Sequence, residues 1–285
     1  MSRSPLISAE ELATLMRSPG HELVIIDARP GKSGYAAGHL DRALHADLNA
    51  DLSGASDEGF DPAQGGRHPL PSIERWSERL GEWGIGPATN VVAYDDHDSS
   101  NSASRVWWML RSAGHTHVRV LDGGLGAALT EGLPMSTAVT VPVPRDRYPA
   151  DAWHWPTVDM NTVNNLRLDP KWKVIDVRSE PRFRGETEPI DPVAGHIPGA
   201  LNAPFVKNLE HGGRFKSAKV LREHFGRMLD GTPAERVVVH CGSGVTACHT
   251  LLAMNAAGLE GASLYVGSWS EWCRNEVPRF VKSDG

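Results

Sequence analysis

The chain repeats itself once, with a period of about half its 285 residues. Both halves contain a short apolar run ending in Asp-x-Arg, then a Gly-His segment, a second apolar run and a helical stretch. The first runs are Leu23–Arg29 and Trp172–Arg178, and the second runs are Asn90–Asp95 and Arg236–Cys241. Apolar runs rich in β-branched residues are typical of buried strands. Strands that alternate with helices at this spacing predict an α/β domain with a mainly parallel sheet flanked by helices, present twice.

A segment without helical periodicity lies between the two halves. From about Met135 to Trp155 the chain is rich in Pro, Val, Thr and Arg, which is typical of an extended linker. We expect a first domain at residues 1–140, a linker at 141–155 and a second domain at 156–285. Two like domains are expected to pack together, and ligand sites favour such junctions.

The composition limits the classes of partner. The formal net charge is -6 and acidic and basic residues are interleaved, which argues against a nucleic-acid-binding surface. No apolar run approaches the ~20 residues needed to span a bilayer. The first residues, Met1–Ser8, lack the apolar core of a signal peptide. We therefore expect a cytoplasmic protein that binds neither nucleic acid nor membrane.

The chain has three cysteines, Cys241, Cys248 and Cys273, all near its end. An odd, clustered set does not resemble a disulfide framework. The sequence has no Cys-x-x-Cys, and the Cys248-His249 pair lacks a second pair of ligands at zinc spacing. We expect no structural metal.

The two halves differ where the second apolar run ends. The first half has Asp95 followed by the polar segment Asp96–Ser102, whereas the second has Cys241 followed by the short, glycine-rich Gly242–Ala247. Ligands bind beyond the carboxyl ends of the strands in an open α/β sheet. Only the second half can carry out thiol chemistry at this place, so we expect an inactive first domain and a catalytic second one.

The residues after Cys241 predict a loop that binds an anion. Gly242 and Gly244 let the backbone curl closely around the sulfur, and the following amides add to the positive end of the next helix. Such a loop lowers the pKa of a thiol and stabilises a bound anion. Thr246 can add a hydroxyl donor or cap the helix. We expect Cys241 to be a nucleophile and the substrate-binding loop to include Gly242, Gly244, Val245 and Thr246.

The segment Cys241–Ala247, Cys-Gly-Ser-Gly-Val-Thr-Ala, resembles the active-site loop of tandem rhodanese-family sulfurtransferases in their mercaptopyruvate form. The two Gly-His segments, Asp176–Arg178, Arg182-Phe183 and Gly267–Trp272 are also similar to that family, and the resemblance covers nearly the whole chain. It implies two tandem rhodanese-like domains. It also implies that Cys241 takes a sulfane sulfur from a small donor as a persulfide and passes it to cyanide or a thiol acceptor. The resemblance implies no cofactor, and thioredoxin-like proteins are candidate acceptors.

The resemblance assigns roles where positions match. Cys241 corresponds to the nucleophile, and Arg182 to the arginine that holds the anionic group of the donor. Ser243 corresponds to a serine that is proposed to work with a histidine and an aspartate of the first domain. His68 matches that histidine by the Leu-Pro that follows it, and Asp61 is our choice for the aspartate.

Two positions leave the donor open. Mercaptopyruvate enzymes usually have a second arginine nine positions after the first, where this chain has Asp191, as in the thiosulfate type. Thiosulfate enzymes typically place cations directly after the cysteine, where this chain has Gly242 and Ser243. We expect mercaptopyruvate or thiosulfate as the donor, with the loop slightly favouring mercaptopyruvate and another cation replacing the missing arginine.

Three alternatives to this interpretation make different demands on the residues around Cys241. A cysteine phosphatase needs an arginine six residues after the nucleophile to hold the phosphoryl oxygens, and that position is Ala247. A thiosulfate:cyanide sulfurtransferase proper stays open, as does a non-enzymatic sulfur-carrier or redox-sensing module.

The remaining conspicuous residues have structural interpretations. The Asp-x-Arg motifs at 27–29 and 176–178 are expected to form internal ion pairs, because charged groups at buried strand ends need partners. His39 and His196 occur in both halves, including the half without a cysteine, which favours structural hydrogen bonds.

Overall fold

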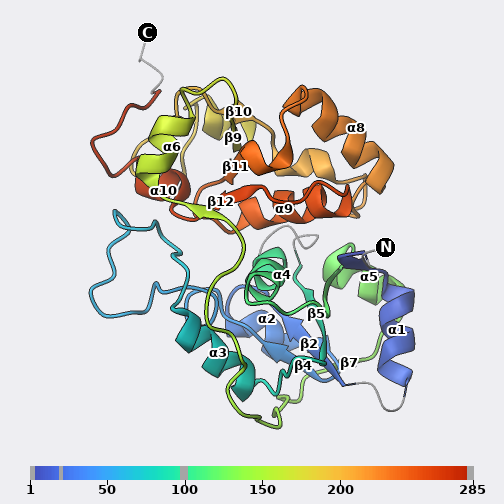
Figure 1. Cartoon of the computed structure of the whole chain (residues 1–285). Coiled ribbons are helices and arrows are strands. Elements are labelled where there is room, and N and C mark those ends of the chain that lie inside the picture. The colour runs from blue at the N-terminus through green and yellow to red at the C-terminus, as the bar shows by residue number, and fades with distance from the viewer. Residues whose placement is uncertain (1–3, 19–21, 97–101, 281–285) are drawn as a thin grey trace. The chain divides into compact units, whose positions relative to one another are not determined.

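The computed structural model describes residues 4–18, 22–96 and 102–280 (Figure 1). The chain divides into two compact units, each made of three segments. Unit 1 comprises Met1–Ser53, Pro71–His154 and Glu210–Phe215. Unit 2 comprises Gly54–Leu70, Trp155–Leu209 and Lys216–Gly285. The segment Gly54–Leu70, which carries His68, therefore belongs to the same unit as Cys241.

Unit 1 is built on a five-stranded sheet in the order β1-β6-β5-β2-β4, with every pair parallel. Its strands are β1 (Leu6–Ile7), β2 (Leu23–Asp27), β4 (Ala43–His45), β5 (Asn90–Tyr94) and β6 (Val118–Leu121). The helices are α1 (Ala9–Arg17), α2 (Lys32–Ala37), α3 (Ile73–Glu82), α4 (Ser102–Ser112) and α5 (Gly124–Thr130). A small antiparallel pair joins β3 (His39–Leu40) to β7 (Met135–Ser136).

Unit 2 has the same plan, with a parallel sheet in the order β10-β9-β11-β12-β8. Its strands are β8 (Thr157–Val158), β9 (Lys173–Asp176), β10 (Leu201–Asn202), β11 (Val237–His240) and β12 (Ser263–Tyr265). The helices are α6 (Met160–Leu166), α7 (Glu180–Phe183), α8 (Ala218–Leu229), α9 (Thr246–Ala256) and α10 (Ser268–Trp272), with 3-10 turns η1 (Phe205–Asn208) and η2 (Ala234–Arg236). The equivalent strands occupy equivalent places in the two sheets, which confirms the α/β fold and the internal repeat.

The central strands are apolar along their whole length because they are buried. Val237, Val238 and Val239 of β11 have no exposed surface, as is usual for parallel strands covered on both faces. The helix that follows is also buried: every residue of α9 from Ala247 to Met254 is inaccessible to solvent or nearly so. A strand and a helix that are both fixed in a core hold the loop between them firmly.

The Asp-x-Arg motifs form the same internal ion pair in both units. Arg29 Nη2 lies 2.6 Å from Asp27 Oδ2, and Arg178 Nη2 lies 2.6 Å from Asp176 Oδ2. Each arginine also donates to the carbonyl of a glycine, Gly38 at 2.6 Å or Gly195 at 2.7 Å. The ion pairs are those that the sequence predicts, and the arginine–carbonyl contacts also tie the end of each buried strand to the Gly-His segment.

The repeated histidines are structural as well. His39 stacks on Tyr35, with ring centroids 3.7 Å apart, and its Nδ1 lies 2.8 Å from the Tyr35 carbonyl oxygen. His196 stacks on Phe183 at 3.8 Å and its Nδ1 lies 2.7 Å from the Phe183 carbonyl oxygen. Burial lowers the pKa of His196, so this ring is held in its neutral form.

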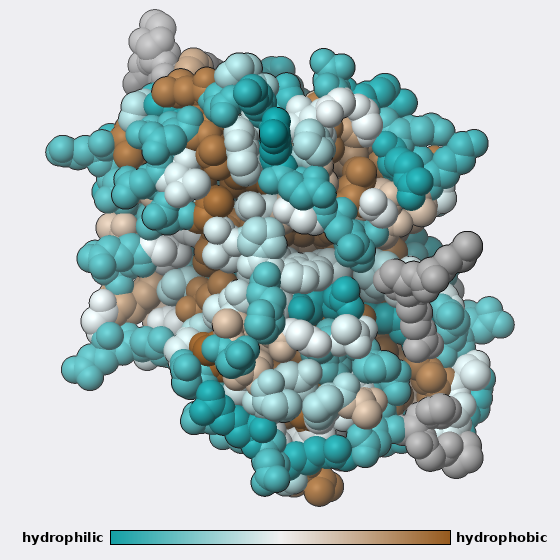
Figure 2. All heavy atoms as spheres, in the orientation of Figure 1, coloured by the Kyte–Doolittle hydropathy of each residue, from teal (hydrophilic) through white to brown (hydrophobic). Residues whose placement is uncertain are grey.

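One face of the molecule can be judged from Figure 2, and it is largely polar. Hydrophilic side chains are spread over the face of the molecule shown in Figure 2, with smaller hydrophobic patches between them. Within residues 4–18, 22–96 and 102–280, none of the helices has the length and hydrophobicity needed to cross a bilayer.

Candidate active site

Cys241 lies between the end of β11 and the start of α9, at the carboxyl end of a buried parallel strand. Its carbonyl accepts a hydrogen bond from the Trp269 amide at 3.1 Å, and its amide donates to Ser268 Oγ at 3.2 Å. The residue is only 3% exposed. The backbone of the cysteine is thus fixed by the turn that follows β12, as the position of a nucleophile requires.

The two glycines of the loop are needed for different structural reasons. Gly244 has φ +74°, and a Cβ there would lie 2.5 Å from the Val266 carbonyl oxygen, so no other residue fits without displacing the backbone. Gly242 has an ordinary φ. A Cβ at Gly242 would lie 3.4 Å from Nη2 of both Arg182 and Arg67, so this glycine leaves room for two guanidinium groups beside the loop.

The remaining loop residues begin the helix. Val245 is the N-cap of α9 and makes no side-chain capping hydrogen bond, and Thr246 is the first helical residue. Thr246 therefore does not cap the helix, so the prediction of a capping role for it is wrong. The first amides of α9 face the loop without a capping side chain, and such amides stabilise a bound anion.

Ser243 contacts His68. The serine Oγ lies 2.9 Å from His68 Nδ1. Ser243 is 7% exposed and His68 is half-buried. The structure thus brings together the two residues that the sequence suggested as a pair, next to the predicted nucleophile.

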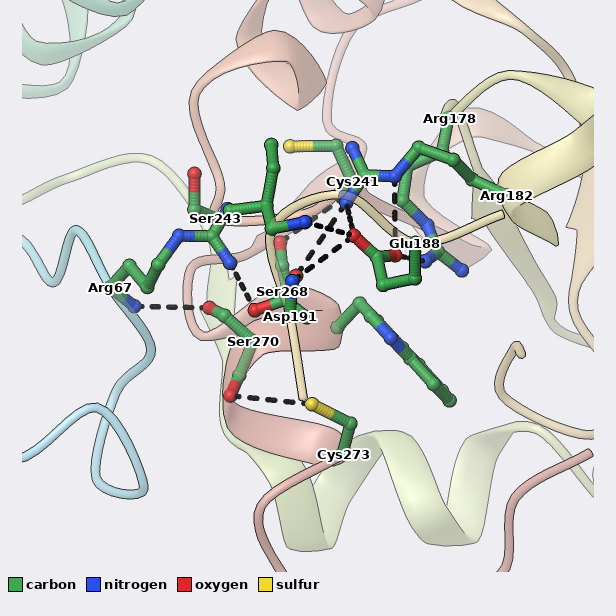
Figure 3. Close-up of polar contacts among 12 residues, drawn as sticks. Arg67, Arg178, Arg182, Glu188, Asp191, Cys241, Ser243, Ser268, Ser270 and Cys273 are labelled. Carbon is green, nitrogen blue, oxygen red and sulfur yellow. Dashed lines mark hydrogen bonds and ion pairs between the residues drawn. The ribbon is translucent and has the colours of Figure 1, made fainter. Parts of the chain in front are cut away.

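The segment that carries His68 is fixed by backbone contacts. The Gly65 amide donates to Glu271 Oε1 at 2.8 Å. The Arg67 amide donates to Ser270 Oγ at 3.0 Å, a contact that Figure 3 shows. Gly66 has φ +79°, and a Cβ there would collide with the Gly267 carbonyl oxygen. This close contact between two backbones needs a glycine and sets the positions of the two side chains that follow.

The structure does not bring Asp61 to His68. Asp61 is exposed, and its Oδ1 accepts a hydrogen bond from the Ala63 amide at 2.9 Å within its own turn. The local turn satisfies the carboxylate, so the choice of Asp61 as the partner of His68 was wrong.

Asp191 stands where mercaptopyruvate enzymes usually have an arginine, and it binds arginines itself. Its Oδ1 accepts hydrogen bonds from Arg67 Nη1 and, at 3.0 Å, from Arg274 Nη1. Its Oδ2 lies 3.6 Å from Arg182 Nη2, which also contacts Glu188 Oε1 at 2.6 Å. Figure 3 shows Arg67, Arg182 and Glu188 grouped around Asp191. Sequence reasoning missed Arg67, although its place directly before His68 was a usable signal.

The buried charges beneath Cys241 are balanced. Burial alone would raise the pKa of Asp176, but the Arg178 guanidinium holds it below its ordinary value. Burial lowers the pKa of His240, whose Nδ1 lies 3.3 Å from the Cys241 carbonyl oxygen. The paired ends of β9 and β11 therefore carry an ionised carboxylate–guanidinium pair, after β9, and a neutral imidazole, at the end of β11.

The equivalent loop of unit 1 holds a carboxylate. The Asp95 carbonyl accepts a hydrogen bond from the Leu125 amide at 2.9 Å, as the Cys241 carbonyl does from Trp269. Asp95 is fully buried, and its Oδ2 accepts a hydrogen bond from the Ala103 amide, in the first turn of α4, at 3.0 Å. Residues 97–101, part of the longer polar loop noted in the sequence, lie outside the described residues.

The other cysteines differ from Cys241 in position. Cys248 lies inside α9, and Cys273 follows α10; both are buried, and all three cysteines are free thiols. Burial raises the pKa of Cys273, which keeps it protonated and poorly nucleophilic. Within the part of the chain that the structure describes, no group of His, Cys, Asp or Glu side chains could hold a metal ion.

Comparison with known proteins agrees with this geometry. A family model described as a rhodanese-like domain matches residues 8–130 and 159–275. The chain is 39% identical over 280 residues to a Pseudomonas aeruginosa protein named "Probable 3-mercaptopyruvate sulfurtransferase", covering 95% of this chain and 96% of that one. It is 32% identical over 294 residues to the thiosulfate sulfurtransferase of Rattus norvegicus, covering 98% and 95%.

A solved structure has the same fold over nearly the whole length of the chain. The Escherichia coli protein described as a 3-mercaptopyruvate sulfotransferase superimposes with a TM-score of 0.76 at 30% identity, covering 94% of this chain and 99% of that one. The two matched domains, the full-length relatives and this structure together identify the chain: it belongs to the rhodanese family and is a sulfurtransferase.

Proposed function

We propose that the protein transfers the sulfur of 3-mercaptopyruvate, through a persulfide on Cys241, to a thiol acceptor or cyanide. The observation that carries the proposal is the contact between Ser243 and His68, 2.9 Å long, beside Cys241. A donor whose carbon must be protonated when its sulfur leaves needs such a pair, whereas thiosulfate does not. The mercaptopyruvate sulfurtransferases among the relatives support the same donor.

The donor carboxylate binds to Arg182 and Arg67 in this proposal. Both guanidinium groups lie beside Gly242, next to the nucleophile, and planar guanidinium groups match a carboxylate in a bidentate manner. Arg67 supplies the second cation that Asp191 cannot supply. The missing arginine at position 191 is therefore no argument against mercaptopyruvate as the donor.

The first half-reaction is attack of the Cys241 thiolate on the donor sulfur. The C–S bond breaks and its electron pair passes to carbon, giving the enolate of pyruvate; the proton of the donor thiol is released and one proton is added to this carbon. Ser243 and His68 form the route by which that proton is held and delivered. The amides at the start of α9 stabilise the persulfide anion that remains on Cys241.

The second half-reaction regenerates the thiolate. The sulfur of a thiolate acceptor, or the carbon of cyanide, attacks the outer sulfur of the persulfide, the S–S bond breaks, and the electron pair returns to Cys241. A thioredoxin-like acceptor and a cytoplasmic location stay predictions from the sequence.

Thiosulfate is the second candidate donor, and the identity of residue 191 favours it. Asp191 matches the thiosulfate type at this position, and thiosulfate sulfurtransferases are among the relatives. The same two arginines can bind sulfonate oxygens. In this case the S–S bond of thiosulfate breaks and sulfite leaves with the electron pair, so that no proton has to reach carbon.

A side-by-side turnover assay with the two donors separates them. We expect kcat/KM for mercaptopyruvate to exceed that for thiosulfate, and Cys241→Ser to transfer sulfur from neither. A preference for thiosulfate would overturn the proposed donor. No turnover with either donor, while Cys241 still reacts with iodoacetamide, would favour a sulfur-carrier or redox-sensing role.

A further inference from the structure

His240, the last residue of β11, has an imidazole ring with one unused nitrogen. The residue is fully buried and directly precedes Cys241. Its Nδ1 lies 3.3 Å from the Cys241 carbonyl oxygen, which can only accept a hydrogen bond, so Nδ1 carries the proton of the neutral ring. Its Nε2 has no hydrogen-bond partner among the described residues and lies 3.9 Å from Asp176 Oδ2. Two acceptors therefore face each other with no proton between them.

Unit 1 has a fixed proton at the equivalent place. Tyr94 is the register partner of Asp27 in its sheet, as His240 is of Asp176. The Tyr94 hydroxyl donates to Asp27 Oδ2 at 2.8 Å and accepts from the Leu40 amide at 3.0 Å. Burial raises the pKa of Tyr94, so this hydroxyl keeps its proton. The unit that lacks the strand-end cysteine thus has a permanent donor to its buried carboxylate, whereas the unit that has the cysteine carries a group that can gain or lose a proton there.

The other titratable groups around this imidazole keep a fixed charge near neutral pH. Asp176 and Arg178 form an ion pair. Burial lowers the pKa of His196, in the Gly-His segment, so its ring is neutral. Burial raises the pKa of Tyr265, on β12, whose ring centroid lies 6.2 Å from that of the imidazole. Among the described groups around the ring, only Cys241 therefore changes its charge in the reaction, from a thiol to a thiolate or a persulfide.

We propose that His240 binds a proton at Nε2 when the sulfur of Cys241 is an anion, and that it thereby stabilises the thiolate and the persulfide. The S–H bond of the cysteine breaks, an N–H bond forms at Nε2 facing Asp176, and the net charge of the two side chains stays zero. The proton exchanges through solvent, so the two side chains need no contact. Opposite charges on adjacent residues in a buried site stabilise each other, and the two groups titrate as a pair.

The consequence is a nucleophile that stays anionic in mildly acidic solution. The imidazole gains its proton more readily as the pH falls, and its positive charge then opposes protonation of the sulfur. Because it is fully buried, His240 is a positioning residue that acts through Cys241 and not on the donor. The inference rests on the proposed function in taking Cys241 as the nucleophile, and it does not depend on which donor is used.

The test is the pH dependence of the reaction of Cys241 with iodoacetamide, because only the thiolate reacts. Mass spectrometry follows the reaction between about pH 5 and pH 9 in the wild type, His240→Gln, His240→Tyr and His224→Gln. Glutamine is polar but cannot bind a proton, and tyrosine copies Tyr94 of unit 1. We expect the midpoint of the pH curve to rise by about one pH unit in both variants at position 240. His224, a half-buried histidine of α8, is the matched control, and its replacement should leave the midpoint unchanged.

An unchanged or lower midpoint in a folded variant at position 240 would overturn the inference. If neither variant folds, NMR of the histidine nitrogens decides in the wild type and in Cys241→Ser. The signals of His240 are identified through the single His-Cys step in the sequence. Nε2 should carry a proton in the wild type at a pH where Cys241 is alkylated rapidly, and it should be unprotonated at the same pH in Cys241→Ser. Equal protonation in the two proteins would contradict the inference.

These measurements separate the inference from the proposed function, because neither needs turnover. The expected rise in the midpoint without turnover of either donor would contradict only the proposed function. Turnover together with an unchanged midpoint would contradict only the role of His240.

Discussion

The loops after β11 and β5 occupy the same place in the two units and hold different groups. Each starts from a residue whose carbonyl accepts a hydrogen bond from the turn after the next strand, 3.1 Å for Cys241 and 2.9 Å for Asp95. In unit 1 the Asp95 carboxylate lies against the first turn of the following helix. In unit 2 the Cys241 thiol is at the equivalent position, and a persulfide formed on it would lie against the first turn of α9, the equivalent helix. The fold provides an anion site twice, and only a side chain that can accept sulfur makes it catalytic.

A second pair of segments shows the same contrast. In unit 1 the short segment 210–215 contacts the turn after β6, where the Phe215 amide donates to Asp122 Oδ1 at 2.8 Å. In unit 2 the longer segment 54–70 contacts the turn after β12 and brings Arg67 and His68 to the cysteine loop. The extra length of this segment supplies the chemistry that the sheet itself lacks.

The largest expected effect comes from exchanging the two strand-end residues. Cys241→Ser should reduce turnover by at least about a thousandfold, because the hydroxyl is a far weaker nucleophile. Adding Asp95→Cys to this variant should not restore activity, because Arg67, Arg182 and His68 all belong to unit 2. Activity of the double variant would show that a cysteine at the strand end suffices. Circular dichroism of both variants checks that the fold is kept.

Replacing His68 tests the long segment of unit 2. His68→Gln should lower kcat with mercaptopyruvate by about a hundredfold, the usual contribution of a positioned acid–base group, and lower kcat with thiosulfate much less. Glutamine can still contact Ser243 but cannot carry the proton. Equal losses with both donors would mean that the histidine only supports the loop.

Replacing Arg67 should have a smaller effect that appears in KM. Arg67→Ala is expected to raise KM for mercaptopyruvate by roughly 10-fold, the value of one charge-assisted hydrogen bond. Arg184, an exposed arginine of unit 2 that pairs with Glu180, is the matched control, and Arg184→Ala should change neither constant. An unchanged KM in Arg67→Ala would remove this residue from the donor site.

The smallest effect concerns pH and the buried histidine of unit 1. Burial lowers the pKa of His115 to about 4, below its value in the unfolded chain, so the unfolded chain binds more protons as pH falls below about 6.5. The contribution of His115 to the free energy of unfolding is therefore fully present above that pH. It declines as the pH falls towards 4, by up to about 3 kcal/mol.

The equivalent residue of unit 2 is Leu259, whose amide makes the same hydrogen bond to the end of a helix. His115→Leu should therefore weaken the dependence of the urea-unfolding free energy on pH between 6.5 and 4. The dependence should not vanish, because burial also lowers the pKa of His196 and His240. The same slope as in the wild type would contradict this account of His115.

The sequence was sufficient for features with local patterns. The buried strands, the Asp-x-Arg pairs and the position of Cys241 follow from apolar runs and glycine spacing, which act over a few residues. The rim of the site depends on contacts between residues far apart in the chain. Arg67 and Asp191 are separated by 124 positions. The sequence therefore indicated that a cation is missing at position 191, but it did not indicate which arginines contact Asp191. The choice of Asp61 failed because a local turn satisfies its carboxylate.

The most direct test of the central claim is the mass of the intact protein after incubation with mercaptopyruvate in the absence of an acceptor. The wild type should gain the mass of one sulfur atom, located by peptide mapping on Cys241, while Cys248 and Cys273 stay unmodified. The gained sulfur should disappear when a thiol acceptor is added, and Cys241→Ser should not gain it. A sulfur atom on either of the other cysteines, or no gain in the wild type, would contradict the assignment of Cys241 as the sulfur carrier.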